Sequence, residues 1–223
     1  MNNTCSLQSK QVCSLNRLYN GDTMDTLSLE QKLEQFQEFF SITHAIKVSM
    51  KPLDARFVLP EVDCLVDHMP YAFQIASEAA DLDVKALRPL RNLGSHAAEL
   101  VNFLNHQSRK IDLMMSLILQ QEEDPALTYT SYKIGGGGVV ILCPNPVDIG
   151  QKVELKLFIK EESSAIFCFG EVITCQAQDD QYHVSLLFTR IREQDQDLMV
   201  RASLHLQQAN LKKRHLKQNI EKN

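Results

Sequence analysis

Between Leu90 and Ile118, apolar residues recur at alternating steps of three and four, with one polar exception. This heptad pattern predicts a long helix over about residues 83–121, with one narrow apolar stripe along it. At about 1.5 Å per residue, the segment is on the order of 40 Å long, more than a small domain covers. The stripe residues are Leu90, Leu93, Ala97, Leu100, Leu104, Gln107, Ile111, Met114 and Ile118.

Two kinds of partner fit this stripe. It packs either against other helices of this chain, or against another copy of the chain. The stripe is longer than the short helices expected elsewhere, which favours a homo-oligomer. Gln107, the polar exception, is typical of a residue that sets the register between helices, and it is equally consistent with a break in the stripe.

After the long helix, the hydrophobic period changes from about 3.6 to two. Strands are expected over residues 127–132, 139–142, 153–159, 163–174 and 182–188. Short strands separated by turn residues predict a small antiparallel barrel. The residues expected to face its interior are Val153, Leu155, Leu157, Val172, Val184, Leu186 and Phe188. A helical pattern returns from Asp195 to about Lys217.

The chain before the long helix is less regular. Residues 1–25 are polar and aperiodic, which predicts a mobile tail. Ser28 and Gln31 have the spacing of a capping box, which predicts the start of a short amphipathic helix. A short strand is expected at Ala45–Met50. We therefore divide the chain into a tail (1–25), a helical region with the oligomerisation helix (26–124), and a β-barrel with a C-terminal helix (125–223). The fold class is α+β.

Composition excludes several classes of protein. The formal net charge of −5 argues against a general nucleic-acid binder. No apolar run is long enough to span a membrane, and no secretory signal is recognisable. The six cysteines include no C-x-x-C pair, which favours reduced thiols and a cytoplasmic location. Acidic residues 122–124 oppose the dipole of the long helix, which predicts a frayed end.

The spacing of chemically active side chains supports no catalytic centre. No Ser or Cys is placed with a His and an acid in a pattern typical of nucleophilic catalysis. The seven histidines show no metal-ligand spacing. The sequence therefore predicts a protein that is not an enzyme, has no catalytic residues, and binds neither a metal nor a cofactor.

Three segments of the β region, in order, resemble the PilZ family: Ile149–Leu155, Gly170–Val172 and Tyr182–Phe188, followed by an acidic helix start. The resemblance covers about Leu127 to Arg214. It implies a six-stranded barrel of the kind that binds the bacterial second messenger cyclic di-GMP. Residues 109–113, near the end of the heptad helix, resemble the divergent branch called atypical or tetrameric PilZ. In that branch, long helices assemble the subunits.

The ligand signature of that family is incomplete in this chain. It comprises R-x-x-x-R just before the barrel and D/N-x-S-x-x-G on the first strands. The two arginines of R-x-x-x-R would bind the phosphates with their guanidinium groups and stack on the guanine rings. No R-x-x-x-R precedes Leu127. In the second part Lys133 replaces Asp or Asn, Gly135 replaces Ser, and only Gly138 matches. This degeneracy predicts weak or absent binding of cyclic di-GMP.

The glycine run at residues 135–138 has two interpretations of its own. It forms a tight bend between strands, or its free N–H groups bind phosphate with help from Lys133.

Together these features predict a non-enzymatic adaptor in cyclic di-GMP signalling. It would self-assemble through the long helix and contact an unidentified signalling or motility protein. The alternative is a cyclic di-GMP receptor that uses substitute basic residues. Its candidate ligand-binding residues are Lys133, Gly135, Gly138, Arg109 and Arg190.

Overall fold

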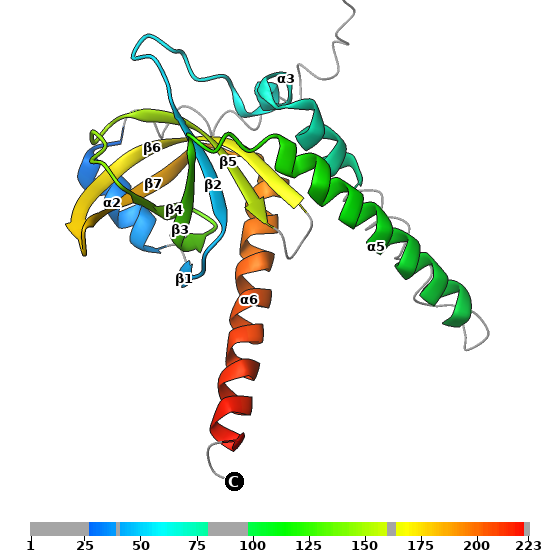
Figure 1. The fold of residues 1–223 in the computed structure, drawn as a ribbon. Coiled ribbons are helices and arrows are strands. Elements are labelled where there is room, and N and C mark those ends of the chain that lie inside the picture. The colour runs from blue at the N-terminus through cyan, green and yellow to red at the C-terminus, as the bar shows by residue number, and fades with distance from the viewer. Residues whose placement is uncertain (1–26, 39–40, 80–97, 160–163, 221–223) are drawn as a thin grey trace, which may run out of the picture.

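The computed structural model describes residues 27–38, 41–79, 98–159 and 164–220, and shows a β-barrel from which two long helices extend (Figure 1). These helices are α5 (Ala98–Gln121) and α6 (Glu193–Ile220). The expected order of a helix, a barrel and a C-terminal helix is confirmed, and so is the α+β class. None of the described helices combines the length and the apolar character that a membrane span requires.

Six antiparallel strands close the barrel. In chain order they are β2 (Lys47–Pro52), β3 (Thr128–Gly135), β4 (Gly138–Cys143), β5 (Lys152–Ile159), β6 (Ser164–Gln178) and β7 (Gln181–Arg190). Their order around the barrel is β3-β2-β5-β6-β7-β4, and pairing of β4 with β3 completes the circle. A short strand, β1 (Ser41–Thr43), pairs with the other end of β3.

One barrel strand comes from the part of the chain that precedes α5. The strand expected at Ala45–Met50 is β2, and it lies between β3 and β5 rather than in a separate helical region. Val48 is opposite Tyr129 on one side and Leu157 on the other. Without β2, strands β3 and β5 would each present an unpaired edge.

The interior of the barrel is filled by alternate residues of its strands. All seven residues expected to face inward belong to one hydrophobic cluster, and each is at most 3% exposed. Met199, Ala202 and Leu206 of α6 belong to the same cluster, so the first part of α6 packs against the barrel core. The period-two pattern therefore identified the inward faces correctly.

A second hydrophobic cluster lies on the outer side of β5 and β6. Phe158, Phe167 and Phe169 pack there against helices that precede the barrel. The helical elements are η2 (Val62–Cys64), α3 (Leu65–His68), residues 71–79, and the end of α5. The rings of Phe73 and Phe158 are 5.7 Å apart. Because both faces of β6 are buried over most of its length, its sequence is almost continuously apolar.

The acidic end of α5 is attached to the barrel. Glu123 forms an ion pair with Lys47 of β2, and Glu122 lies 3.5 Å from Lys156 of β5. The helix itself ends at Gln121, and fraying of this end stays a prediction, although both carboxylates find cations on the neighbouring strands.

The capping box at the start of α2 (Leu29–Glu38) is confirmed. The Ser28 N–H donates to Oε1 of Gln31 over 2.9 Å, and the Gln31 N–H donates to Oγ of Ser28 over 3.3 Å. In Figure 1, α2 lies against the outside of the barrel near β6 and β7, on the opposite side from α5.

We expect Phe188→Ala to lower the free energy of unfolding by about 3–5 kcal/mol, because its ring is buried in the barrel core. Chemical denaturation monitored by circular dichroism measures this loss. Tyr71→Ala removes a ring that is 75% exposed and is the matched control. A loss below about 1 kcal/mol for Phe188→Ala would contradict the assigned barrel interior.

Candidate functional site

The glycine run forms the tight connection between β3 and β4. Gly135 is paired with Gly138, and Gly136 and Gly137 form the turn. All four glycines are buried. A Cβ atom added to Gly138 would lie 2.5 Å from Cε2 of Phe36 and 2.3 Å from the carbonyl oxygen of Leu186. Close approach of α2 to the strand therefore requires glycine at this position.

Helix α6 covers the other side of the turn. A Cβ atom on Gly136 would lie 2.8 Å from Cγ2 of Val200. The side-chain amide of Gln196 donates to the Gly136 carbonyl over 3.1 Å, and the Phe188 N–H donates to the Gly137 carbonyl over 3.0 Å. The run is thus the tight bend of the first interpretation. Side chains of α2 and α6 occupy the space beside it.

A buried ion pair holds α2 to the barrel next to this turn. Nζ of Lys32 lies 2.8 and 2.7 Å from the two carboxylate oxygens of Glu171 on β6. The two side chains are only 9% and 12% exposed. Neither residue was predicted from the sequence as part of a site, although Glu171 lies within the PilZ-like segment Gly170–Val172. The local signal at Lys32 was its position one turn before Phe36 on the apolar side of a short helix.

The candidate ligand residues are not gathered at one place. Lys133 is exposed on β3, and its Nζ lies 5.8 Å from the ring centre of Tyr132. Gly135 and Gly138 share its hairpin but are buried. Arg190 is 6% exposed and donates from Nη1 to the Thr189 carbonyl over 2.9 Å.

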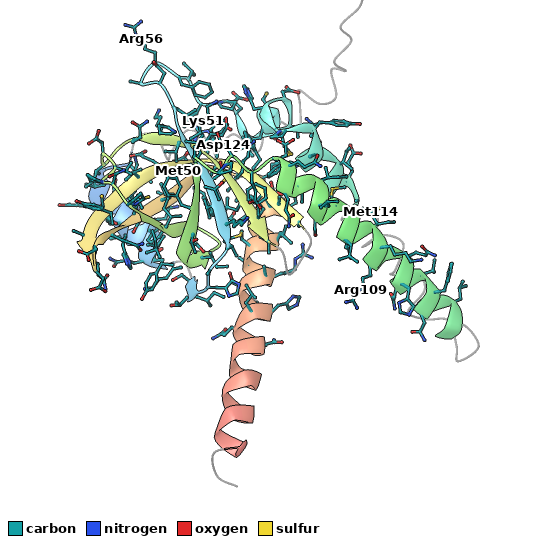
Figure 2. All side chains as sticks on the ribbon, in the orientation of Figure 1. Met50, Lys51, Arg56, Arg109, Met114 and Asp124 are labelled. Carbon is teal, nitrogen blue, oxygen red and sulfur yellow. The ribbon has the colours of Figure 1, made fainter. Side chains whose placement is uncertain are left out.

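Arg109, the fifth candidate, lies on the part of α5 that extends away from the barrel (Figure 2). Within a single copy of the chain it is therefore separated from the glycine turn. The assignment of these five residues to a ligand stays a prediction.

Helix α5 has two apolar faces. Met115 and Leu119 are buried against the chain's own helices and β6. The outer face of α5 carries large apolar side chains that are between 43% and 65% exposed: Leu100, Phe103, Ile111, Leu113, Met114, Leu117 and Ile118. Four of these belong to the heptad stripe. Leu104 and Gln107 are half-buried, while Leu90, Leu93 and Ala97 lie outside the described residues.

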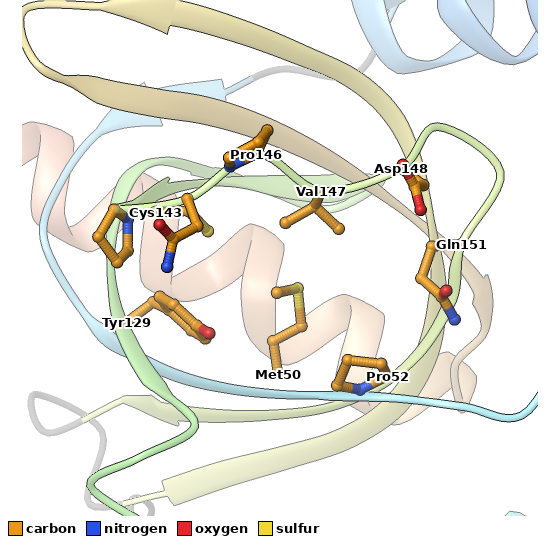
Figure 3. A pocket seen from close by; sticks show the side chains of 10 residues that line it. Met50, Pro52, Tyr129, Cys143, Pro146, Val147, Asp148 and Gln151 are labelled. Atoms are coloured by element: carbon orange, nitrogen blue, oxygen red, sulfur yellow. The ribbon is translucent and has the colours of Figure 1, made fainter.

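A cavity of about 280 Å³ lies at one end of the barrel (Figure 3). Met50, Tyr129 and Cys143 lie along its walls, and Asp148 is on its rim. Burial raises the pKa of the Cys143 thiol to about 11, with a smaller contribution from Cys175, and burial also raises the pKa of Tyr129. Both groups are therefore protonated near neutral pH, and neither supplies a nucleophile or a base there.

The described part of the chain contains no cluster of three His, Cys, Asp or Glu side chains that could hold a metal ion.

Comparison with protein families identifies the barrel. Residues 105–204 match the family model of the PilZ domain. The chain contains a PilZ domain. The match begins within α5 and ends within α6, so it spans β3 to β7 and leaves β1 and β2 outside. The resemblance found in the sequence is confirmed.

Solved structures with a similar fold include a tetrameric PilZ domain from Xanthomonas campestris that self-assembles through a helical bundle. It is 17% identical, the comparison covers 86% of this chain and 98% of that chain, and the TM-score is 0.51. This match supports the divergent PilZ fold with a long helix before the barrel.

Two further structures match less well. The Bacillus subtilis inhibitor of motility MotI/DgrA is 10% identical, with a TM-score of 0.41 and coverage of 77% of this chain and 51% of that chain. The PilZ domain of YcgR from Escherichia coli, solved with cyclic di-GMP, is 11% identical, with a TM-score of 0.34 and coverage of 40% and 77%. No curated protein sequence matches the chain.

We expect Gly138→Ala to destabilise the PilZ domain by about 1–3 kcal/mol, because the added methyl group meets a backbone carbonyl that cannot easily move. Gly136→Ala is the matched control, since its methyl group meets no backbone atom and only one methyl group of Val200, a side chain that is 43% exposed. Thermal and denaturant melts compare the two variants. Equal, small losses would show that packing does not require glycine at 138.

Proposed function

We propose that this chain is a non-enzymatic PilZ adaptor in bacterial cyclic di-GMP signalling, which self-assembles through α5 and acts in the cytoplasm by protein–protein contact. One observation carries the proposal: α5 exposes large apolar side chains at 100 and 103 and again between 111 and 118, all on one side of the helix. Exposed apolar patches of this kind typically mark protein interfaces.

The width of the outer face of α5 bears on the number of partners. At about 100° per residue, its exposed apolar side chains span roughly 160° of the helix circumference. The stripe of a two-stranded coiled coil is narrower. Each α5 is therefore expected to contact at least two other helices. The tetrameric helical bundle of the Xanthomonas campestris protein is a precedent for this arrangement.

A second copy of the chain is the occupant that best fits this face. Leu100, Ile111 and Ile118 all fall on the a or d positions of one heptad pattern, and such a pattern is complementary to itself. Gln107, half-buried within the same stripe, would fix the register between copies.

We expect Ile111→Gln combined with Met114→Gln to convert an oligomer into monomers, because both side chains are exposed in the single chain and would be buried between copies. Light scattering after size-exclusion chromatography measures the mass. Asn102→Gln with Asn105→Gln changes two exposed polar positions of the same helix and should leave the mass unchanged. A monomeric wild-type protein at tens of micromolar would exclude assembly through α5.

The adaptor role, as opposed to a receptor role, is supported by the surroundings of the glycine turn. Phe36 and Val200 lie against two of its glycines, and Arg190 is buried. A receptor has to offset the desolvation of two phosphates and two guanines with several charged contacts. Lys133 is the one exposed cation among the candidate residues of this hairpin.

We expect cyclic di-GMP to bind with a dissociation constant above roughly 100 µM. Each bidentate Arg–phosphate contact contributes on the order of 1.5–3 kcal/mol. Loss of two such arginines, together with the Asp/Asn and Ser contacts, therefore weakens binding about a thousandfold. Calorimetric titration at low and at physiological salt measures the affinity.

Micromolar binding in that titration would favour the alternative, a receptor with substitute basic residues. In that case, Arg109→Ala and Arg190→Ala show whether either arginine contacts the ligand, from the same copy or from another. Arg201→Ala, an exposed arginine on α6, is the control.

A further inference from the structure

We propose that α2 is an exchangeable occupant of a docking surface on the outer wall of the PilZ barrel. The partner is a helix of another protein that carries a lysine or arginine and, four residues later, an aromatic side chain. The α2 surface, as we call it, consists of Gly138, Leu187 and Glu171. This inference rests on the proposed adaptor function and identifies where an adaptor would receive its partner.

The α2 surface is a row across three neighbouring strands. Gly138 of β4 is opposite Leu187 of β7, and Leu187 is opposite Glu171 of β6. Leu186 and Phe188 face the barrel interior, so Leu187 between them faces outward. It is nevertheless fully buried, as expected beneath a helix. The row therefore consists of a position without a side chain at Gly138, the apolar side chain of Leu187 and the carboxylate of Glu171.

Helix α2 matches this row with two side chains one turn apart. The ring of Phe36 lies against Gly138, where any side chain would collide with it. Lys32 reaches Glu171 with a bidentate ion pair. A buried carboxylate without a cation is strongly unfavourable, so any helix that replaces α2 has to supply one. This requirement defines the basic and aromatic character of the partner.

Several features of α2 favour exchange over permanent packing. The helix has ten residues, and helices of this length are marginal without tertiary contacts. Leu29, one of its few apolar residues, is 43% exposed. Oε1 of Gln35 is buried, yet it accepts no hydrogen bond from any described residue. An unpaired buried acceptor is destabilising, and a buried ion pair adds little net stability.

The contrast with the helices on the other side of the barrel strengthens this inference. There, Leu65, Phe73 and Leu119 are at most 4% exposed and pack against the phenylalanines of β5 and β6. That contact is mainly apolar, with the ion pairs of Glu122 and Glu123 beside it, whereas the contact of α2 depends on one ion pair and one ring. Of the two, the α2 contact is the one that a competing helix could replace.

A peptide in trans tests the proposal directly. The probe is a fluorescent peptide of residues 27–38, and the protein is the full-length Phe36→Ala variant, whose own α2 is weakened. We expect this variant to bind the peptide at least tenfold more tightly than the wild type, because the wild-type α2 competes for the same surface. Fluorescence polarisation measures both affinities.

Two matched controls identify the contact. Adding Glu171→Gln to the Phe36→Ala variant should weaken peptide binding at least tenfold, because the carboxylate that holds the lysine is lost. A peptide with Lys32→Gln should show the same loss, whereas one with Glu34→Gln, an exposed position, should bind normally. A folded Phe36→Ala variant that binds no peptide would overturn the proposal, as would binding that does not depend on Glu171.

Native-state hydrogen exchange of the wild type provides a test that requires no variant. We expect the amides of α2 to exchange at least tenfold faster than those of β6 and β7, through local opening. Exchange of α2 only at the rate of global unfolding would overturn the proposal, even if Phe36→Ala fails to fold. Neither measurement depends on α5 or on cyclic di-GMP, so the α2 surface can fail while the proposed function stands.

Discussion

The arrangement of this protein depends on β2, the strand that closes the barrel. It pairs with β3 on one side and with β5 on the other. In the sequence, however, several helices that end with α5 lie between β2 and these two strands. Closing such a long loop is entropically costly, and the closed barrel offsets this cost by removing two open edges. Helix α5 therefore has to end beside β2, so that β3, which follows it, can pair with β2. The ion pair of Lys47 with Glu123 lies at that point.

The outer wall of the barrel is then divided among helices. The second hydrophobic cluster covers β5 and β6, α2 covers the row from Gly138 to Glu171, and α6 lies against the β3–β4 turn. Gly138, which matches the PilZ ligand signature, and its neighbour Gly136 serve this packing. The surface of the glycine turn is thereby covered by the chain's own helices, which supports the proposed adaptor role over a receptor role.

The two helices on opposite sides of the barrel differ in how they are held. The C-terminal end of α5 packs on the second cluster, with ion pairs of Glu122 and Glu123 beside it, while its outer face stays exposed. Helix α2 is held by one ion pair and by the ring of Phe36 against Gly138. Apolar contacts of the first kind suit permanent architecture, whereas contacts of the second kind suit exchange. Assembly through α5 and docking through the α2 surface would then occupy separate parts of the molecule.

The sequence by itself determined what repeats locally. Alternation over two residues identified inward side chains such as Val184 and Phe188, heptad spacing identified the helix that became α5, and Ser28 with Gln31 marked the start of α2. Only the tertiary structure decided the place of β2, the purpose of Gly138, and the pairing of Lys32 with Glu171. These two charges are 139 residues apart. No local pattern encodes such a contact, because it exists only after the barrel has closed and α2 has packed against it.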